Sequence, residues 1–182
     1  MRWVRRRFGG EVLEIAAGTA RNLPRYPEGV TLTATELSLE MLAIARNRAE
    51  ELSYPVDLRL GDAQQLEFED ESFDTVVCTL ALCTIPDPDR AVAEAHRVLR
   101  PGGRLLLFEH VRSPRLPIRA VQRLIEPLTV RLEGDHQTRE PLDYLEPEGF
   151  EIERLERLKW GIVERVAARK PASARPRPEL KA

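Results

Sequence analysis

The chain has 182 residues, a formal net charge of -2, and a composition that is 42% hydrophobic and 32% charged. These values are typical of a single globular domain, and the near-neutral balance excludes a general electrostatic attraction to nucleic acid. No apolar stretch approaches the roughly 20 residues that a membrane-spanning helix needs.

The two ends differ in composition from the part between them. Residues 1–10 form a basic stub with Arg2 and Arg5 to Arg7, which we interpret as the exposed end of a helix or as a weak peripheral contact with anionic lipid. Residues 171–182 are rich in proline and are expected to be disordered. The single domain is therefore expected over residues 11–170.

Strand and helix patterns alternate through this domain. Apolar or alternating runs predict strands over 11–15, 30–35, 56–62, 72–83, 104–111, 150–158 and 162–170. Helical spacing predicts helices over 19–26, 39–52, 89–99, 118–132 (broken at Pro127) and 143–148. This order predicts an α/β fold, with a mostly parallel seven-stranded sheet, helices on both faces and an antiparallel C-terminal hairpin.

The segment from Glu11 to Glu36 indicates a site for a ribose-bearing cofactor. A strand enters a turn of small residues, and the next strand ends on a carboxylate, Glu36. Small residues allow a ligand to approach the backbone, and a carboxylate can accept hydrogen bonds from two ribose hydroxyls. Asp62 and residues 79–81 also lie at the carboxyl ends of strands, and these ends of parallel strands meet at one edge of the sheet.

Four motifs together resemble the class I S-adenosylmethionine-dependent methyltransferases. They are the turn EIAAGTA (14–20), the string TELSLEML after the second strand, GDAQQLEFEDESFD (61–74), and HRVLRPGGRLLLFEH (96–110). Within that superfamily the strings VVCTLALCTI (76–85) and GDHQTRE (134–140) are similar to those of the thiol S-methyltransferases of the methyltransferase-like seven group. The ubiquinone-biosynthesis methyltransferases share the core motifs, and the bacterial phosphatidylethanolamine N-methyltransferases are a more distant possibility.

The resemblance implies a Rossmann-like class I methyltransferase fold and S-adenosylmethionine as cofactor, with S-adenosylhomocysteine as product. It implies that Glu36 accepts the ribose hydroxyls, and that Asp62 and the Ala63 amide meet the adenine. The full set of implied cofactor residues is Glu14, Ala16, Gly18, Thr19, Ala20, Glu36, Leu37, Met41, Asp62, Ala63, Thr79 and Leu80. Ala16 and Ala20 depart from the family, which usually has glycine there. An alanine costs about 1 kcal/mol or more where φ is positive, but Ala20 is expected to open a helix, where alanine is favourable.

The acceptor side is less defined by the sequence. His110 is the candidate catalytic residue, as a base for the acceptor proton, and a structural histidine is the equal alternative. Cys83, His136 and Trp160 are candidates for the acceptor pocket, and no metal is expected. The acceptor is expected to be small and apolar, a thiol first and a phenol second, while the oligomeric state stays open.

Two other classes of function remain as alternatives. A nicotinamide dehydrogenase would need G-x-G-x-x-G, whereas AAGTAR has one glycine. A catalytically impaired methyltransferase-like interaction module is the second alternative, because Ala16 and Ala20 replace glycines. Cys78 and Cys83 are expected to be reduced core residues, which indicates a cytoplasmic protein.

Overall fold

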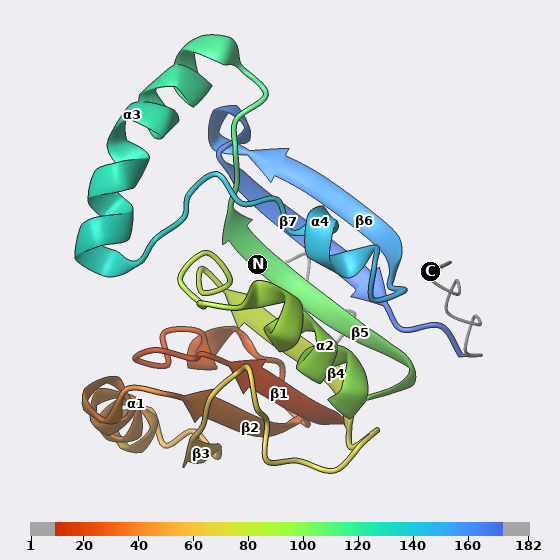
Figure 1. The fold of residues 1–182 in the computed structure, drawn as a ribbon. Helices are drawn as coiled ribbons and strands as arrows, with labels where there is room; N and C mark the ends of the chain where they lie inside the picture. Colours follow the sequence, from red (N-terminus) through yellow and green to blue (C-terminus); the bar gives the residue numbers. More distant parts are fainter. Residues whose placement is uncertain (1–9, 173–182) are drawn as a thin grey trace.

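A sheet of seven strands forms the centre of the computed structural model, which describes residues 10–172 (Figure 1). In chain order the strands are β1 (Glu11–Ile15), β2 (Thr31–Glu36), β3 (Asp57–Leu60), β4 (Phe73–Thr79), β5 (Leu99–His110), β6 (Glu151–Leu158) and β7 (Val163–Arg169). They lie in the order β3-β2-β1-β4-β5-β7-β6. The pairs among β1 to β5 are parallel, and β7 is antiparallel to both β5 and β6. The predicted fold class is confirmed.

Helices cover both faces of this sheet. The elements are α1 (Leu39–Glu51), α2 (Pro88–Val98), α3 (Leu116–Glu133), α4 (Leu142–Leu145) and the short 3-10 turns η1 (Leu23–Arg25) and η2 (Lys159–Gly161). Side chains of α1 and η1 pack on one face, and those of α2 and α4 pack on the other. Both longer covering helices begin at residues that the sequence marks as caps: Ser38 accepts from the Met41 N–H, and Asp87 accepts from the Arg90 N–H.

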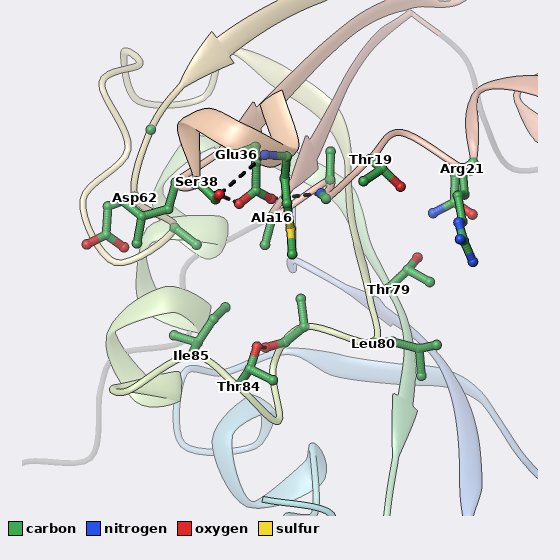
Figure 2. A pocket seen from close by; sticks show the side chains of 18 of the residues that line it. Ala16, Thr19, Arg21, Glu36, Ser38, Asp62, Thr79, Leu80, Thr84 and Ile85 are labelled. Atoms are coloured by element: carbon green, nitrogen blue, oxygen red, sulfur yellow. Dashed lines mark hydrogen bonds between the residues drawn. The ribbon is translucent and has the colours of Figure 1, made fainter. Parts of the chain in front are cut away.

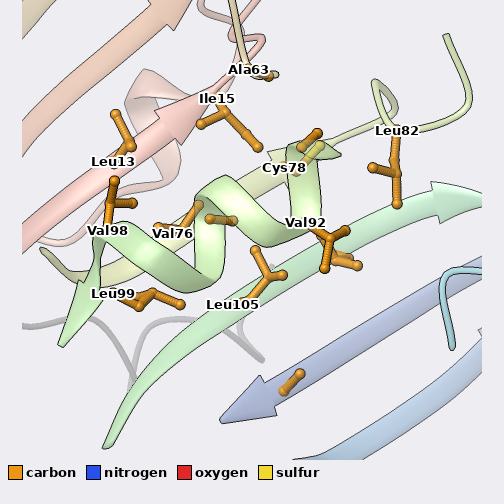
Figure 3. Close-up of a cluster of buried hydrophobic side chains, with 14 of the residues drawn as sticks. Leu13, Ile15, Ala63, Val76, Cys78, Leu82, Val92, Val98, Leu99 and Leu105 are labelled. Carbon is orange, nitrogen blue, oxygen red and sulfur yellow. The ribbon is translucent and has the colours of Figure 1, made fainter. Parts of the chain in front are cut away.

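The larger core lies between α2 and the central strands (Figure 3). Val76 of β4 is fully buried, with Leu13 of β1 and Leu105 of β5 on either side in the sheet and Val92 and Val98 of α2 above. β4 is buried on both of its faces, as its continuous apolar run predicts. This packing fixes the strand ends that carry the site.

The helix predicted over residues 19–26 is wrong. The chain runs through turns there, and only Leu23–Arg25 forms a 3-10 turn. Gly18 and Ala20 have φ of 58° and 55°, a left-handed conformation that an α-helix cannot include, and Pro24 follows closely. The sequence therefore places a helix where the structure has a tight loop against the site.

The predicted break at Pro127 is also wrong, because α3 continues through it to Glu133. Proline removes one backbone hydrogen bond from the helix. Side chains on both sides of it hold α3 in place: Glu126 accepts from the Thr138 N–H and hydroxyl, and the Thr129 hydroxyl donates to the Asp135 carbonyl. The helix ends at Gly134, whose φ of 67° suits a glycine cap.

Helix α3 is tied to the domain by a buried polar side chain and carries exposed apolar side chains on its outer face. Gln122 is buried, accepts 2.8 Å from the Ser113 N–H, and donates 2.9 Å to the Val111 carbonyl. Leu124 and Leu128, on the outer side, are 80% and 59% exposed. Figure 1 shows α3 standing off the sheet beyond the end of β5. Polar contacts, not a hydrophobic core, therefore hold this helix to the domain.

Across residues 10–172 no helix is both long and apolar enough to span a membrane. The expectations for the basic N-terminal stub and the proline-rich tail fall almost wholly outside the described residues. Both Cys78 and Cys83 are buried and free, as expected.

Candidate functional site

A cavity of about 920 Å³ opens at the carboxyl ends of β1, β2, β3 and β4 (Figure 2). We call it the rim pocket. Its walls are Ala16–Thr19, Arg21, Asn22, Arg25, Glu36–Ser38, Met41, Gly61–Gln64, Thr79–Ala81, Thr84–Pro86, Phe108 and Arg165. Ten of the twelve predicted cofactor residues lie in this wall; the exceptions are Glu14 and Ala20. The volume is near the upper end of the range for small-molecule sites.

The turn after β1 forms one wall with a strained backbone. Ala16, Gly18 and Ala20 all have positive φ, at 50°, 58° and 55°. The expectation that alanine at 20 sits comfortably at a helix start is therefore wrong. Ala20 is fully buried in the α1-side core and turns its methyl group away from the pocket. Each alanine costs about 1 kcal/mol or more relative to glycine in this conformation.

Glu36 joins the turn after β1 to the start of α1. Its Oε2 accepts a hydrogen bond of 2.7 Å from the Gly18 N–H, and its Oε1 accepts one of 2.8 Å from the Ser38 N–H. The side chain is 7% exposed and lines the pocket. Each carboxylate oxygen can accept more than one hydrogen bond, so Glu36 can also accept from a ligand hydroxyl.

Glu14 lies behind the pocket wall and not in it, because its position in β1 directs it beneath the turn. It is 1% exposed and accepts a hydrogen bond of 2.6 Å from the Asn22 side chain, which does line the pocket. Burial raises the pKa of the Glu14 carboxyl from 4.5 to about 7, against smaller opposite effects of Asn22, Tyr26 and Arg25. Glu14 therefore acts as a positioning residue for the loop.

Asp62 and Ala63 close the side of the pocket beyond β3. Asp62 Oδ1 accepts 2.8 Å from the Gln64 N–H, which fixes the carboxylate at the end of this strand. Gly61 lies close to Thr35, because a Cβ added to Gly61 would lie 3.3 Å from the Thr35 Cγ2. The Asp62 carboxylate lines the rim pocket just after β3, beside the end of β2 that carries Glu36, as expected for a group that meets the base of a nucleoside.

The opposite wall comes from the turn that follows β4. The predicted strand over 72–83 is too long, because β4 ends at Thr79 and Leu80 has a φ of 52°. Thr84 and Ile85 reach the pocket, as Figure 2 shows, although they were not among the predicted site residues. Arg165 of β7 also reaches it, and no local motif indicates that residue.

A second, smaller cavity of about 470 Å³ lies under α3, and we call it the α3 groove. It is lined by His110, Pro117, Ile118, Val121, Gln122, Ile125, Gln137, Trp160 and Ile162. Two predicted acceptor-side residues, His110 and Trp160, thus meet here. His136 lines neither cavity; its backbone N–H donates 3.0 Å to the Cys83 carbonyl.

Cys83 lies behind the groove in a cluster with His110 and Asp135. The sulfur, a ring nitrogen and a carboxylate oxygen of these three residues all lie within 4.8 Å of one another. Burial, followed by the charges of Glu109 and Asp135, raises the pKa of the Cys83 thiol. Asp135 was not among the predicted site residues, because only the folded chain brings the loop after α3 against the turn after β4.

Glu109 faces the other side of β5 from His110. Its Oε1 accepts hydrogen bonds from the Ala81 and Leu82 amides at 3.2 and 3.3 Å and from the Cys78 thiol. It is 1% exposed, and burial raises its pKa to about 7. Glu109 therefore holds the turn after β4 in place from within the core.

The comparison with protein families decides the identity of this arrangement. A family model described as a methyltransferase domain matches residues 13–107, which contain most of the rim pocket. The chain belongs to the methyltransferase domain family.

The relatives of this methyltransferase domain act on different acceptors according to their names. The chain is 42% identical over 119 residues to a phosphatidylethanolamine N-methyltransferase of Cereibacter sphaeroides, covering 64% of this chain and 59% of that protein. It is 33% identical over 152 residues to a thiol S-methyltransferase of Rattus norvegicus, covering 80% of this chain and 62% of that protein. The chain thus spans less than two thirds of either relative.

Solved structures support the architecture of the methyltransferase domain. An S-adenosylmethionine-dependent methyltransferase of Methanosarcina mazei aligns with a TM-score of 0.74 at 24% identity, covering 90% of this chain and 93% of that one. A [4+2]-cyclase, SpnF, aligns with a TM-score of 0.76 at 23% identity, covering 94% and 80%. At these identities the likeness shows the fold alone, and function has to be argued from the site.

S-adenosylmethionine, the cofactor that this family implies, fits the residues of the rim pocket. Glu36 and Asp62 both present carboxylates to the pocket, and these can accept hydrogen bonds from ribose hydroxyls and from an adenine amine. Leu37 and Met41 add apolar surface beside Glu36, and the turn at Gly18 leaves open space, since an added Cβ would meet nothing within 4 Å. When bound, this cofactor supplies a sulfonium methyl group for transfer.

Proposed function

We propose that this domain transfers the methyl group of S-adenosylmethionine to a small apolar acceptor, with a thiol as the first choice and a phenol as the second. The observation that carries the proposal is the α3 groove, an apolar cavity of about 470 Å³ beside the rim pocket. Five of its lining residues come from α3, and four of these five are apolar. Such a lining suits a small acceptor with little charge.

The groove and the rim pocket are neighbours along two segments. Phe108 lines the rim pocket, and His110, two residues further along the same face of β5, lines the groove. Thr84 lines the rim pocket, while the adjacent Cys83 has its sulfur within 4.8 Å of a ring nitrogen of His110. An acceptor in the groove can therefore direct its head toward the methyl donor.

One feature of the comparisons supports a thiol. The relatives named thiol S-methyltransferases from Rattus norvegicus and Homo sapiens align over 80% and 82% of this chain, and the one from Mus musculus aligns over 57%. The phosphatidylethanolamine and demethylmenaquinone methyltransferases align over 64% and 62%. The rat and human thiol enzymes therefore align over more of this chain than these two other relatives do.

In this reaction the protein binds and orients the cofactor and the acceptor and excludes water from them. Glu36 and Asp62 hold the nucleoside part, and the positive-φ turn at Ala16 to Ala20 shapes the space beside it. Ile125 and the other apolar residues of the groove keep water from the reacting sulfur, which strengthens it as a nucleophile.

The test measures methyl transfer to an alkyl thiol, a matched phenol and a charged thiol. We expect turnover in that order, with S-adenosylhomocysteine as the second product. Ile125→Asp places a charge in the groove and should lower activity about tenfold or more without changing the affinity for S-adenosylhomocysteine. Leu124→Asp, one residue away on the outer face of α3, is the control and should leave activity unchanged. Equal loss in both variants, or preference for the charged thiol, contradicts the proposal.

The alternative is a methyltransferase-like interaction module without catalysis. The strained alanines at positions 16 and 20 favour it, because the family usually has glycine there. This alternative predicts that S-adenosylhomocysteine binds while none of the three acceptors is methylated.

A further inference from the structure

We propose that Cys83, His110 and Asp135 bind a divalent transition-metal cation of the zinc type, and that the cation's open position holds the acceptor thiol as a thiolate. This inference rests on the proposed function for its second half only. The first half concerns the chain's own side chains and can be tested without any acceptor.

The three side chains carry the donor atoms that such a cation prefers. A cysteine sulfur, a histidine nitrogen and a carboxylate oxygen are the three ligand types found at zinc. Those of Cys83, His110 and Asp135 lie within 4.8 Å of one another, and a shift of less than about 1 Å would bring them to the spacing around one tetrahedral ion. Three protein ligands also leave a fourth position for a substrate, as in catalytic zinc sites.

Asp135 gives an independent sign that a ligand is missing. The residue is 8% exposed, and its Oδ1 is buried without a hydrogen-bond partner. Its Oδ2 accepts 3.1 Å from the Gln137 side chain, which orients the carboxylate. A buried carboxylate oxygen without a partner is costly, and a cation would satisfy it.

The negative charge of the cluster also favours a bound cation. Glu109 is buried nearby, and its Oε1 accepts hydrogen bonds from the Ala81 and Leu82 amides in the turn that leads to Cys83. Within residues 10–172, neither Asp135 nor Glu109 forms an ion pair with a lysine or arginine. A divalent cation would balance the negative charge of the Asp135 carboxylate, and a coordinated thiol loses its proton outright.

The ligands come from three segments that other contacts hold together. Arg139 donates to the carbonyls of Leu82 and Ile85 at 2.9 and 2.6 Å, which locks the loop after α3 onto the turn after β4. The Thr129 hydroxyl donates 2.9 Å to the Asp135 carbonyl and fixes the start of that loop. The site is thus built before any ligand enters, as tight coordination requires.

The open position would face the α3 groove, because His110 lines the groove whereas Cys83 is buried behind it. An acceptor thiol that enters the groove would bind the cation as thiolate and release its proton to water. Its sulfur then forms a bond to the methyl carbon while the carbon–sulfonium bond breaks, leaving a thioether and S-adenosylhomocysteine. In this arrangement the cation replaces His110 as the group that lowers the acceptor's pKa.

The test is a titration of the untagged, metal-stripped chain with Co²⁺, followed by absorbance. Thiolate coordination gives an intense near-ultraviolet charge-transfer band, and tetrahedral Co²⁺ gives visible bands. We expect the charge-transfer band and the visible bands to be complete at one equivalent of Co²⁺. Both should disappear when Zn²⁺ is added and displaces Co²⁺. Cys83→Ser should remove the charge-transfer band, and Asp135→Asn should weaken Zn²⁺ binding about 100-fold.

Cys78→Ser is the matched control, because Cys78 is the other buried free cysteine and lies outside the cluster. It should keep both the band and the affinity. Circular dichroism and S-adenosylhomocysteine binding check that each variant is folded. Absence of the charge-transfer band in the folded wild-type chain, or its loss in Cys78→Ser alone, overturns the metal site. Metal binding without methylation of any thiol would leave the metal site standing and contradict the proposed function and the acceptor role instead.

Discussion

The Glu36 carboxylate accepts a hydrogen bond of 2.7 Å from the Gly18 backbone N–H, eighteen residues earlier in the chain. This contact connects the end of β2 to the turn after β1, and the Ser38 N–H binds the other oxygen. One side chain therefore shapes the loop that borders the rim pocket and also presents oxygens to it. Replacement of Glu36 should therefore disturb both the loop after β1 and the binding of a ligand in the rim pocket.

Glu36→Ala is expected to weaken binding of S-adenosylhomocysteine by about 1–3 kcal/mol, because it removes a ligand contact and frees the loop at Gly18. Isothermal titration calorimetry measures the effect. Glu40→Ala, on the exposed first turn of α1, is the control and should bind like the wild type. An unchanged dissociation constant for the Glu36 variant would remove our assignment of the cofactor site.

Ala16→Gly is expected to leave the free energy of unfolding unchanged or raise it by up to about 1 kcal/mol. The φ of 50° is strained for alanine, and relief of that strain offsets the entropy that glycine adds to the unfolded chain. Ala17→Gly in the same turn should lower stability by about 0.5–1 kcal/mol, because its φ is not positive. Urea unfolding of both variants gives the comparison, and a similar loss in each would show that Ala16 is unstrained in solution.

Glu14 is expected to make stability depend on pH. Its carboxyl has a pKa of about 7 in the folded chain and 4.5 ordinarily, so the folded state holds the proton more tightly. Its contribution is then complete below about pH 4.5 and is lost as the pH rises to about 7, a fall of roughly 3 kcal/mol. The groups that face it are Asn22, Tyr26 and Arg25.

Glu14→Gln keeps an oxygen for Asn22 and removes the titration. Its free energy of unfolding should therefore fall less than that of the wild type between about pH 5 and about pH 8. Urea unfolding at both values provides the measurement, with Glu40→Gln as an exposed control. Identical pH dependence in the wild type and the Glu14 variant would mean that Glu14 is not the group concerned.

Gln122 and Leu124 should show that polar contacts hold α3. Gln122→Ala removes two buried hydrogen bonds. It should therefore lower the free energy of local unfolding of α3 by about 1–3 kcal/mol. Leu124→Ala should change stability by no more than about 0.5 kcal/mol, because the side chain is 80% exposed. Amide hydrogen exchange of residues 116–133 measures the local unfolding of α3 in each variant. A larger effect at Leu124 would mean that its apolar face is covered in solution.

Short-range patterns were sufficient for the parts of the site whose geometry is local. Glu36 follows its strand directly, and the turn of small residues follows β1, so strand ends alone place both at the rim. The turn at Pro101 to Gly103 is equally local, since a Cβ on Gly103 would lie 2.8 Å from the Arg100 carbonyl oxygen. Patterns failed where backbone strain ended an element early, as at Ala20 and Leu80.

The sequence by itself determined the α/β order, the seven strands and ten of the residues around the rim pocket, because periodicity and strand-end position depend on neighbours in the chain. Only the tertiary structure decided that Asp135 meets Cys83 and His110, and that Arg165 reaches the rim pocket. Asp135 is 25 positions from His110 and 52 from Cys83, and Arg165 is 57 from Phe108, the nearest pocket residue in the chain. Loop lengths and helix packing, which no local pattern encodes, bring these residues together. The same reason explains why α3 hides Gln122 and exposes Leu124: the direction of its polar face is set by the body it contacts, not by its own sequence.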